Sequence, residues 1–201
     1  MTTIPRKFLH MLAMSPFLIG ALFMDTYVPR IWYIVLSLIV LVFFLLFEIY
    51  RLEHPPFNET LFRLFHPHIF KTHERHRVFS GICGPINMLL LALFFSKSTV
   101  ISAFIIASYA DPIAAIVGMR FGGKKNFVGR TWMGSFAFFA SGAVLLLIAQ
   151  RFLNIPLSPL IMVGFAAIAA LIEHYINFLD DNFVVPMTFA IIMELALRMA
   201  M

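Results

Sequence analysis

Asp111 is a carboxylate in an apolar part of the sequence, where a charged side chain is costly to place. It is followed by Pro112 and lies eight residues before the expected cytosolic end of its helix, about 12 Å deep at 1.5 Å per residue. Such a carboxylate costs roughly 2.5–3.5 kcal/mol to insert, so Asp111 is a candidate for chemistry, or else an ion-pair partner of a neighbouring helix. Pro112 removes a backbone donor and can kink the helix there.

The next segment combines glycines with positive charge. Ala114, Ala115, Gly118 and Gly122 continue the helical face of Asp111, and small residues let a backbone or a ligand approach closely. Free backbone amides, cations and the start of the following helix all favour an anion such as phosphate. The loop lacks the Ser or Thr and the preceding strand of a P-loop. A basic membrane-flanking loop with turn glycines is the alternative. The candidate phosphate-binding residues are Gly118, Gly122, Lys124, Lys125, Arg130, Thr131, Gly134 and Ser135.

A third polar segment lies near the C-terminus. Glu173, Asn177 and Asp180 or Asp181 would share one face if their helix continues through them. Adjacent carboxylates and an amide are the hard oxygen ligands that magnesium takes, together with substrate phosphates. A solvated acidic turn is the simpler interpretation. The catalytic candidates are Asp111, Asp181 and Glu173, and the metal-binding candidates are Asp111, Asp181 and Asn182.

Several charged residues near the expected membrane boundary are supporting candidates. Their simpler roles are headgroup anchoring and interfacial ion pairing. Five histidines also crowd residues 52–78, but none forms a helical H-x3-H pair, and we do not expect a zinc site there. The supporting candidates are Arg6, Lys7, His10, Glu48, Arg51, Glu74 and Arg75.

The elements that must position these residues are membrane helices. Of the 201 residues, 61% are hydrophobic and 12% are charged, whereas soluble domains carry about 25% charged residues. This composition excludes a soluble enzyme and a disordered chain. A single cysteine excludes a disulfide framework and a cysteine-based zinc site. We therefore predict an all-α, polytopic helical bundle that forms a single membrane domain over residues 1–201.

About seven spans are expected, because a crossing helix needs roughly 20 apolar residues. We expect the first to be retained rather than cleaved as a signal. An N-terminus in the cytosol places eleven of the 15 Lys and Arg residues inside, which predicts an N-in, C-out topology. Eight of the ten carboxylates then share that face, and the net charge of +5 needs no nucleic-acid partner. The predicted spans are 9–25, 31–50, 79–96, 99–119, 133–152, 157–176 and 183–200.

Taken in order, these motifs resemble the CTP-dependent lipid-alcohol kinases: dolichol kinase, phytol kinase and the yeast-type diacylglycerol kinase. The resemblance runs from about residue 6 to residue 186, and the length is similar to that of compact bacterial or archaeal members. Arg130 departs from the pattern, where lysine is expected. The motifs are R-K-x-x-H at Arg6, E-x-x-R at Glu48, E-R at Glu74, D-P-x-A at Asp111, R-T-x-x-G-S at Arg130 and D-N-x-x-x-P at Asp181.

The resemblance implies transfer of the CTP γ-phosphate to the hydroxyl of a membrane lipid alcohol, giving CDP and a lipid phosphate. The acceptor would be a polyprenol, a phytol-like isoprenoid or diacylglycerol, in a prokaryotic cytoplasmic membrane with the site facing the cytosol. Asp111 and Asp181 would bind Mg²⁺ or orient the hydroxyl, with Asn182 and Glu173 supporting them. The glycine-rich basic loop would hold the triphosphate.

Two alternatives belong to other classes. A phosphatidate cytidylyltransferase also combines CTP, magnesium and a membrane lipid, but it releases pyrophosphate. A transporter would line a permeation path with Asp111 and Glu173, yet the outer halves of the predicted spans are nearly all apolar and no inverted repeat is present. The identity of the alcohol, the basis of cytosine recognition and the oligomeric state stay open.

Overall fold

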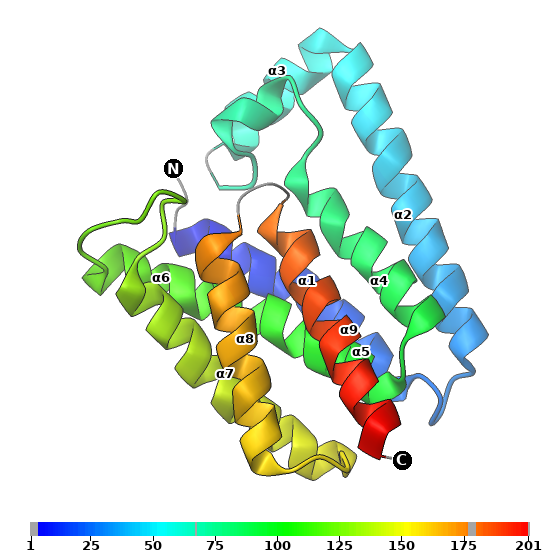
Figure 1. Cartoon of the computed structure of the whole chain (residues 1–201). Coiled ribbons are helices and arrows are strands. Elements are labelled where there is room, and N and C mark those ends of the chain that lie inside the picture. Colours follow the sequence, from blue (N-terminus) through cyan, green and yellow to red (C-terminus); the bar gives the residue numbers. More distant parts are fainter. Residues whose placement is uncertain (1–3, 67, 177–179, 201) are drawn as a thin grey trace.

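The computed structural model describes residues 4–66, 68–176 and 180–200 as helices joined by short connections (Figure 1). No β-strand occurs in these three ranges, which confirms the predicted all-α class. The α-helices are α1 (Ile4–Phe23), α2 (Arg30–Glu53), α3 (Pro55–Phe65), α4 (Cys83–Phe94), α5 (Lys97–Ile105), α6 (Asp111–Phe121), α7 (Trp132–Leu153), α8 (Pro159–Tyr175) and α9 (Asp181–Ala200). Two 3-10 turns, Thr72–Arg75 and Ser80–Ile82, and a π-helical segment, Ile106–Ala110, complete them.

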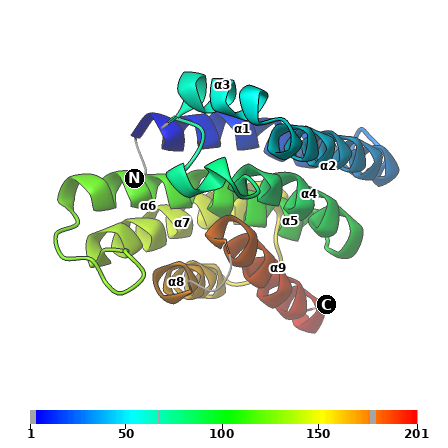
Figure 2. The same ribbon diagram turned by 90° about the horizontal axis from the view of Figure 1, so that it is seen from above.

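The helices form three layers (Figure 2). Helices α1, α2 and α3 lie on one side, α7, α8 and α9 lie on the other, and α4, α5 and α6 lie between them. The continuous rod Lys97–Phe121, made of α5, the π-helical segment and α6, is the central element. Of its most apolar 18-residue stretch, 61% is buried inside the protein, whereas only 17% of the corresponding stretch of α2 is buried. The sequence around Asp111 therefore lies at the centre of the fold.

Within residues 4–66, 68–176 and 180–200, four helices are long and apolar enough to cross a membrane, so the fold is compatible with an integral membrane protein. Two further apolar helices are shorter: α4 has 12 residues and α8 has 17. Helix α2 turns an apolar face outward, as expected of a helix that faces lipid. That face includes Leu36, Ile39, Phe43 and Leu46. The four candidate spans are Arg30–Glu53, Lys97–Phe121, Trp132–Leu153 and Asp181–Ala200.

The central rod changes its hydrogen-bond pattern immediately before Asp111. The backbone N–H of Asp111 donates to the carbonyl of Ile106, five residues back, which closes a π-helical turn. Pro112 has no N–H to continue the ladder, so the wider turn accommodates the lost donor. The expected local distortion beside Asp111 is therefore present as a π-bulge.

A buried arginine holds the connection between α2 and α4 in place. The Arg51 side chain is fully buried and donates two hydrogen bonds to Glu48, at 2.9 and 2.7 Å. It also donates to Asn58 Oδ1 at 2.8 Å and to the carbonyls of Glu74 and Arg77. Since the acceptors of these hydrogen bonds belong to α2, α3 and the segment after α3, Arg51 fixes how this segment returns to α4.

Replacing Arg51 by methionine should therefore destabilise the protein strongly. The change leaves Glu48 buried without its cation, which costs roughly 3–5 kcal/mol in comparable buried pairs. Arg75→Met is the matched control, because the Arg75–Glu59 ion pair is exposed to solvent. Unfolding in detergent, followed by circular dichroism, should show a large loss for Arg51→Met only. Equal losses in the two variants would contradict this role of Arg51.

Candidate functional site

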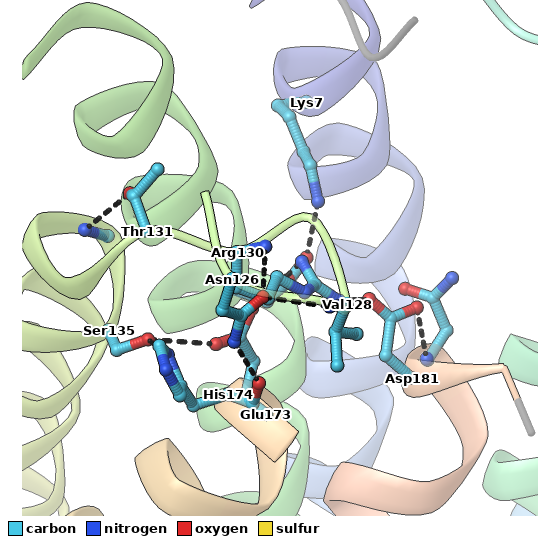
Figure 3. A network of polar contacts seen from close by, with 12 residues as sticks. Lys7, Asn126, Val128, Arg130, Thr131, Ser135, Glu173, His174 and Asp181 are labelled. Carbon is cyan, nitrogen blue, oxygen red and sulfur yellow. Dashed lines mark hydrogen bonds and ion pairs between the residues drawn. The ribbon is translucent and has the colours of Figure 1, made fainter. Parts of the chain in front are cut away.

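The predicted site residues gather at one end of the bundle, which we call the polar end. Here α1 begins, α8 ends, α9 begins and the loop 122–131 joins α6 to α7 (Figure 1). Side chains from all of these elements converge there (Figure 3). Segments far apart in the sequence therefore form one polar cluster, as the sequence predicts for a site on a single membrane face.

Arg130 lies at the centre of this cluster and connects two helices. Its Nη1 lies 2.8 Å from Oε1 of Glu173, near the end of α8, and its Nη2 contacts Oδ2 of Asp181, at the start of α9. Burial disfavours the charged form of Arg130, but Asp181 and Glu173 outweigh this effect and hold its pKa above the usual value for arginine. The guanidinium is thus a permanent cation between two carboxylates.

Asn126 shapes the loop that presents Arg130. Its Oδ1 accepts hydrogen bonds from the backbone N–H groups of Val128, at 3.0 Å, and Arg130, at 2.8 Å. Its Nδ2 donates to the carbonyl of His174 at 2.9 Å, which ties the loop to α8 (Figure 3). Gly129 has a φ of 87°, a left-handed conformation that other residues rarely adopt. The tight turn around Asn126 therefore directs Arg130 toward the carboxylates.

Thr131 begins α7 and packs against small residues of α6. Its Oγ1 accepts from the N–H of Gly134 at 3.1 Å and caps the helix. A Cβ at Gly118 would come within 2.9 Å of that oxygen, and one at Gly134 within 3.0 Å of the Ala114 carbonyl. Gly122 also packs against Thr131. These glycines thus allow α6 and α7 to approach closely, while the same face borders the cavities described below.

Asp111 pairs with the N-terminal helix. Lys7 Nζ donates to Asp111 Oδ2 at 2.7 Å, and both side chains are largely buried. A second buried contact joins α7 to α8: Ser135 Oγ and His174 Nδ1 share a hydrogen bond at 2.6 Å, and Ser135 also reaches Glu173. The carboxylates of all three catalytic candidates are therefore held by partners from other elements.

Three cavities follow one another at the polar end. The polar cavity, about 540 Å³, is bordered by Lys7, Lys71, Arg130 and Asp181. It shares Ala115, Gly129 and Arg130 with the glycine-loop cavity, about 390 Å³, which also borders Gly118, Gly123, Lys125, Thr131 and Ser135. On its other side it shares Arg6, His10 and Asn182 with the apolar cavity, about 420 Å³. Shared walls make the three cavities neighbours.

Charge in the polar cavity is mixed. Lys71 lies 3.6 Å from Asp180 and opposes the local excess of carboxylates. Burial, reinforced by the neighbouring Asp181, raises the pKa of Asp180, while Lys71 acts in the opposite direction. A cavity with cations and carboxylates on its walls can bind an anion directly or through a cation shared with it.

The prediction that Glu173 and Asp181 lie on one face of a continuous helix is wrong. Helix α8 ends at Tyr175 and α9 begins at Asp181, so the helix does not continue through both. Residue 177 lies outside the described ranges. Instead, Arg130 joins the two carboxylates. Among the described residues no group of three or more His, Cys, Asp or Glu is placed to hold a metal ion.

The other predicted residues occupy different parts of the polar end. Lys124 is exposed and borders none of the three cavities, whereas Lys125 borders the glycine-loop cavity. Arg6 lies 4.0 Å from the buried Glu74 and borders both the polar and the apolar cavity. Glu48 and Arg51 form the buried network described above, and Arg75 pairs with Glu59 outside the cavities.

Three polar residues of the cluster have no role in the sequence analysis. Lys71 faces Asp180, Asn126 organises the loop, and His174 joins Ser135 to α8. An asparagine shortly before Gly129 is typical of a side-chain-closed turn, and this spacing is the signal that points to Asn126. No comparable signal marks Lys71, because its partner is distant in the sequence.

Comparison with known proteins adds little to this geometry. No family model matches the chain. No solved structure matches it either. The chain is similar to an uncharacterized protein of Rickettsia prowazekii (strain Madrid E), with 27% identity over 170 residues that cover 82% of each chain.

Replacing Arg130 by methionine should loosen the loop 122–131. The change leaves the carboxylates of Glu173 and Asp181 without their shared cation. The two negative charges then repel each other, which pushes α8 and α9 apart. We expect backbone amides of residues 123–131 to exchange with deuterium at least about tenfold faster, since the ion pairs contribute roughly 1.5–3 kcal/mol each. Lys124→Met, in the same loop but exposed, should leave exchange unchanged. Equal exchange in both variants would contradict the bridging role.

Proposed function

We propose that this chain is an integral membrane kinase that transfers the γ-phosphate of CTP to the hydroxyl of a membrane lipid alcohol. The order of the three cavities carries the proposal. A phosphoryl transfer between a water-soluble donor and a lipid acceptor needs an anion-binding region next to an apolar one. The polar cavity meets this requirement, because the glycine-loop cavity adjoins it on one side and the apolar cavity on the other.

The glycine-loop cavity is suited to the nucleotide phosphates. The start of α7 presents backbone N–H groups and a positive dipole end, and Lys125 adds charge. Arg130 borders both this cavity and the polar cavity. Its guanidinium carries five N–H donors, so contacts with Glu173 and Asp181 leave others for a phosphate. In this proposal the γ-phosphate extends past Arg130 into the polar cavity, where Lys7 and Lys71 face it.

Asp111 is the group that we assign to the acceptor hydroxyl. One of its oxygens accepts a hydrogen bond from Lys7 Nζ, which orients the carboxylate and leaves its other oxygen for the hydroxyl. An ionised carboxylate can accept the proton that leaves the hydroxyl as the phosphate is attacked. Glu173, Asp181 and Asn182 then have supporting roles around Arg130.

The carboxylates of this site suit a magnesium ion that is shared between the protein and the substrate phosphates. Asp111 and Asp181 supply carboxylate oxygens at the polar end, and magnesium in kinases is bound by one or two carboxylates together with substrate phosphates. Asp111 and Asp181 would hold it, with Asn182 beside them. The ion would neutralise charge on the phosphates. Because such a site is completed by substrate, a cluster of three protein ligands is not required.

The membrane arrangement that belongs to this proposal has seven spans with the polar end in the cytosol, in a prokaryotic cytoplasmic membrane. Helices occur at each of the seven predicted ranges, and successive long helices run in opposite directions (Figure 1). The basic loops at the polar end agree with the positive-inside rule. CTP would then enter from the cytosol and the lipid alcohol from the bilayer.

A product assay on protein purified in detergent tests the reaction. Magnesium and γ-labelled CTP or ATP are supplied with phytol, farnesol, a polyprenol, dolichol or diacylglycerol. We expect label in a lipid phosphate with CTP and not with ATP. Formation of a CDP-lipid and pyrophosphate from phosphatidate would instead make the protein a cytidylyltransferase and overturn the proposed reaction.

Asp111→Asn should lower the turnover number at least about a hundredfold, because an amide cannot accept the hydroxyl proton. The variant should remain folded in detergent, since asparagine has nearly the same shape. Asp25→Asn is the control: Asp25 pairs with Arg30 at the other end of the bundle, and its φ of 60° suits asparagine. Near-normal turnover in Asp111→Asn would refute the assignment.

A further inference from the structure

The apolar cavity contains polar atoms that the fold itself does not use. Its walls include Phe17, Phe44, Phe104 and Pro186, and it borders the polar cavity. Within the described part of the chain, Arg6 Nη1, His10 Nε2 and Asn87 Oδ1 are buried atoms without a hydrogen-bond partner. All three residues border this cavity. Because a buried polar atom without a partner destabilises the fold, three of them around one cavity indicate a missing polar ligand group.

Asn87 is the most informative of the three. It lies in α4, among apolar residues, and is only 2% exposed. Its Nδ2 donates to the backbone carbonyl of Asn182 at 2.7 Å. This bond fixes the side-chain amide and leaves Oδ1 as an acceptor in a defined place. An unpartnered acceptor on Asn87 and an unpartnered donor on Arg6 border the same cavity, which matches a hydroxyl group, since a hydroxyl both donates and accepts.

We propose that the apolar cavity binds the tail of a single-chain lipid alcohol and that Asn87 Oδ1 accepts the hydrogen bond from its hydroxyl in the bound complex, before that hydrogen passes to Asp111 in the transfer step. This inference rests on the proposed function and identifies the acceptor class within it. Arg6 Nη1 donates to the oxygen of that hydroxyl, and His10 borders the same cavity. Arg6 and His10 also border the polar cavity, so the hydroxyl lies at the boundary between the two cavities, where transfer would occur.

The size of the cavity favours one chain over two. At roughly 30 Å³ per non-hydrogen atom, the volume of a water molecule in the liquid, about 420 Å³ holds on the order of fourteen such atoms. One isoprenoid chain of moderate length fills this space, and any longer part extends into the bilayer. Diacylglycerol would have to place two chains and a glycerol ester group in the same volume. The phenylalanine walls also suit a branched, unsaturated chain.

The test compares acceptors and variants in one assay. With γ-labelled CTP, we expect kcat/KM for geranylgeraniol to exceed that for dioleoylglycerol at least tenfold. Asn87→Leu should raise the KM for geranylgeraniol about tenfold, because the hydroxyl loses its acceptor, and should leave the KM for CTP unchanged. Ser102→Ala is the matched control: Ser102 Oγ is also buried without a partner but borders none of the three cavities.

A second variant tests the tail region without touching Asn87. Ala107 borders the apolar cavity and is half-buried, so Ala107→Phe should fill part of it and shift the preference from geranylgeraniol toward the shorter farnesol. Ala137→Phe, at a half-buried position on α7 outside the cavity, should not change that preference. If Asn87→Leu fails to fold, this pair still decides the location of the tail.

A binding measurement separates this inference from the reaction. A geranylgeraniol analogue carrying a diazirine in its tail should crosslink to peptides containing Phe44 or Phe104, and excess geranylgeraniol should prevent this. Crosslinking there without phosphorylation of any alcohol would overturn the kinase proposal and support this site. Phosphorylation with a preference for dioleoylglycerol, or a crosslink only to the outward face of α2, would overturn this site and support the kinase proposal.

Discussion

The polar end depends on the neutralisation of buried carboxylates by cations from other parts of the chain. Arg130 brings a loop between α6 and α7 into contact with Glu173 of α8 and Asp181 of α9. Lys7 does the same between α1 and Asp111 of α6. An isolated buried charge is far more costly than a paired one. The helices that meet at the polar end are therefore held by contacts that none of them could satisfy alone.

A second network supports the walls of the cavities. Arg51 and Glu48 are buried together, and Glu48 also accepts from the backbone N–H of Phe79 at 2.8 Å. Glu74 accepts from the backbone of Ser80 and faces Arg6. Phe79, Ser80 and Arg6 all border the apolar cavity. The predicted supporting residues Glu48, Arg51 and Glu74 thus hold a wall of the apolar cavity in place.

The sequence allows the helices to be predicted, but not how the polar residues are joined. Lipid requires long apolar segments, so the ranges around residues 31–50 and 133–152 are readily recognised and agree with α2 and α7. The cluster at one end agrees with the prediction that these polar segments share one face. In contrast, the bridge from Arg130 to Glu173 and Asp181 depends on where α8 ends and how the loop turns. Asn87 is recognisable only as an amide in an apolar helix until its contact with Asn182 is known.

The bridge also gives a physical reason for arginine at position 130. Lysine carries its charge on one nitrogen, whereas the planar guanidinium offers separate nitrogens with fixed directions. Here Nη1 contacts Glu173 and Nη2 contacts Asp181, on two different helices. A lysine at this position would hold one carboxylate well and the other poorly. Arginine in place of the lysine of the resembled pattern is therefore matched to this arrangement, because it joins α8 to α9. Arg130 also borders the polar and the glycine-loop cavity, where Lys7, Lys71 and Lys125 provide more compact charges.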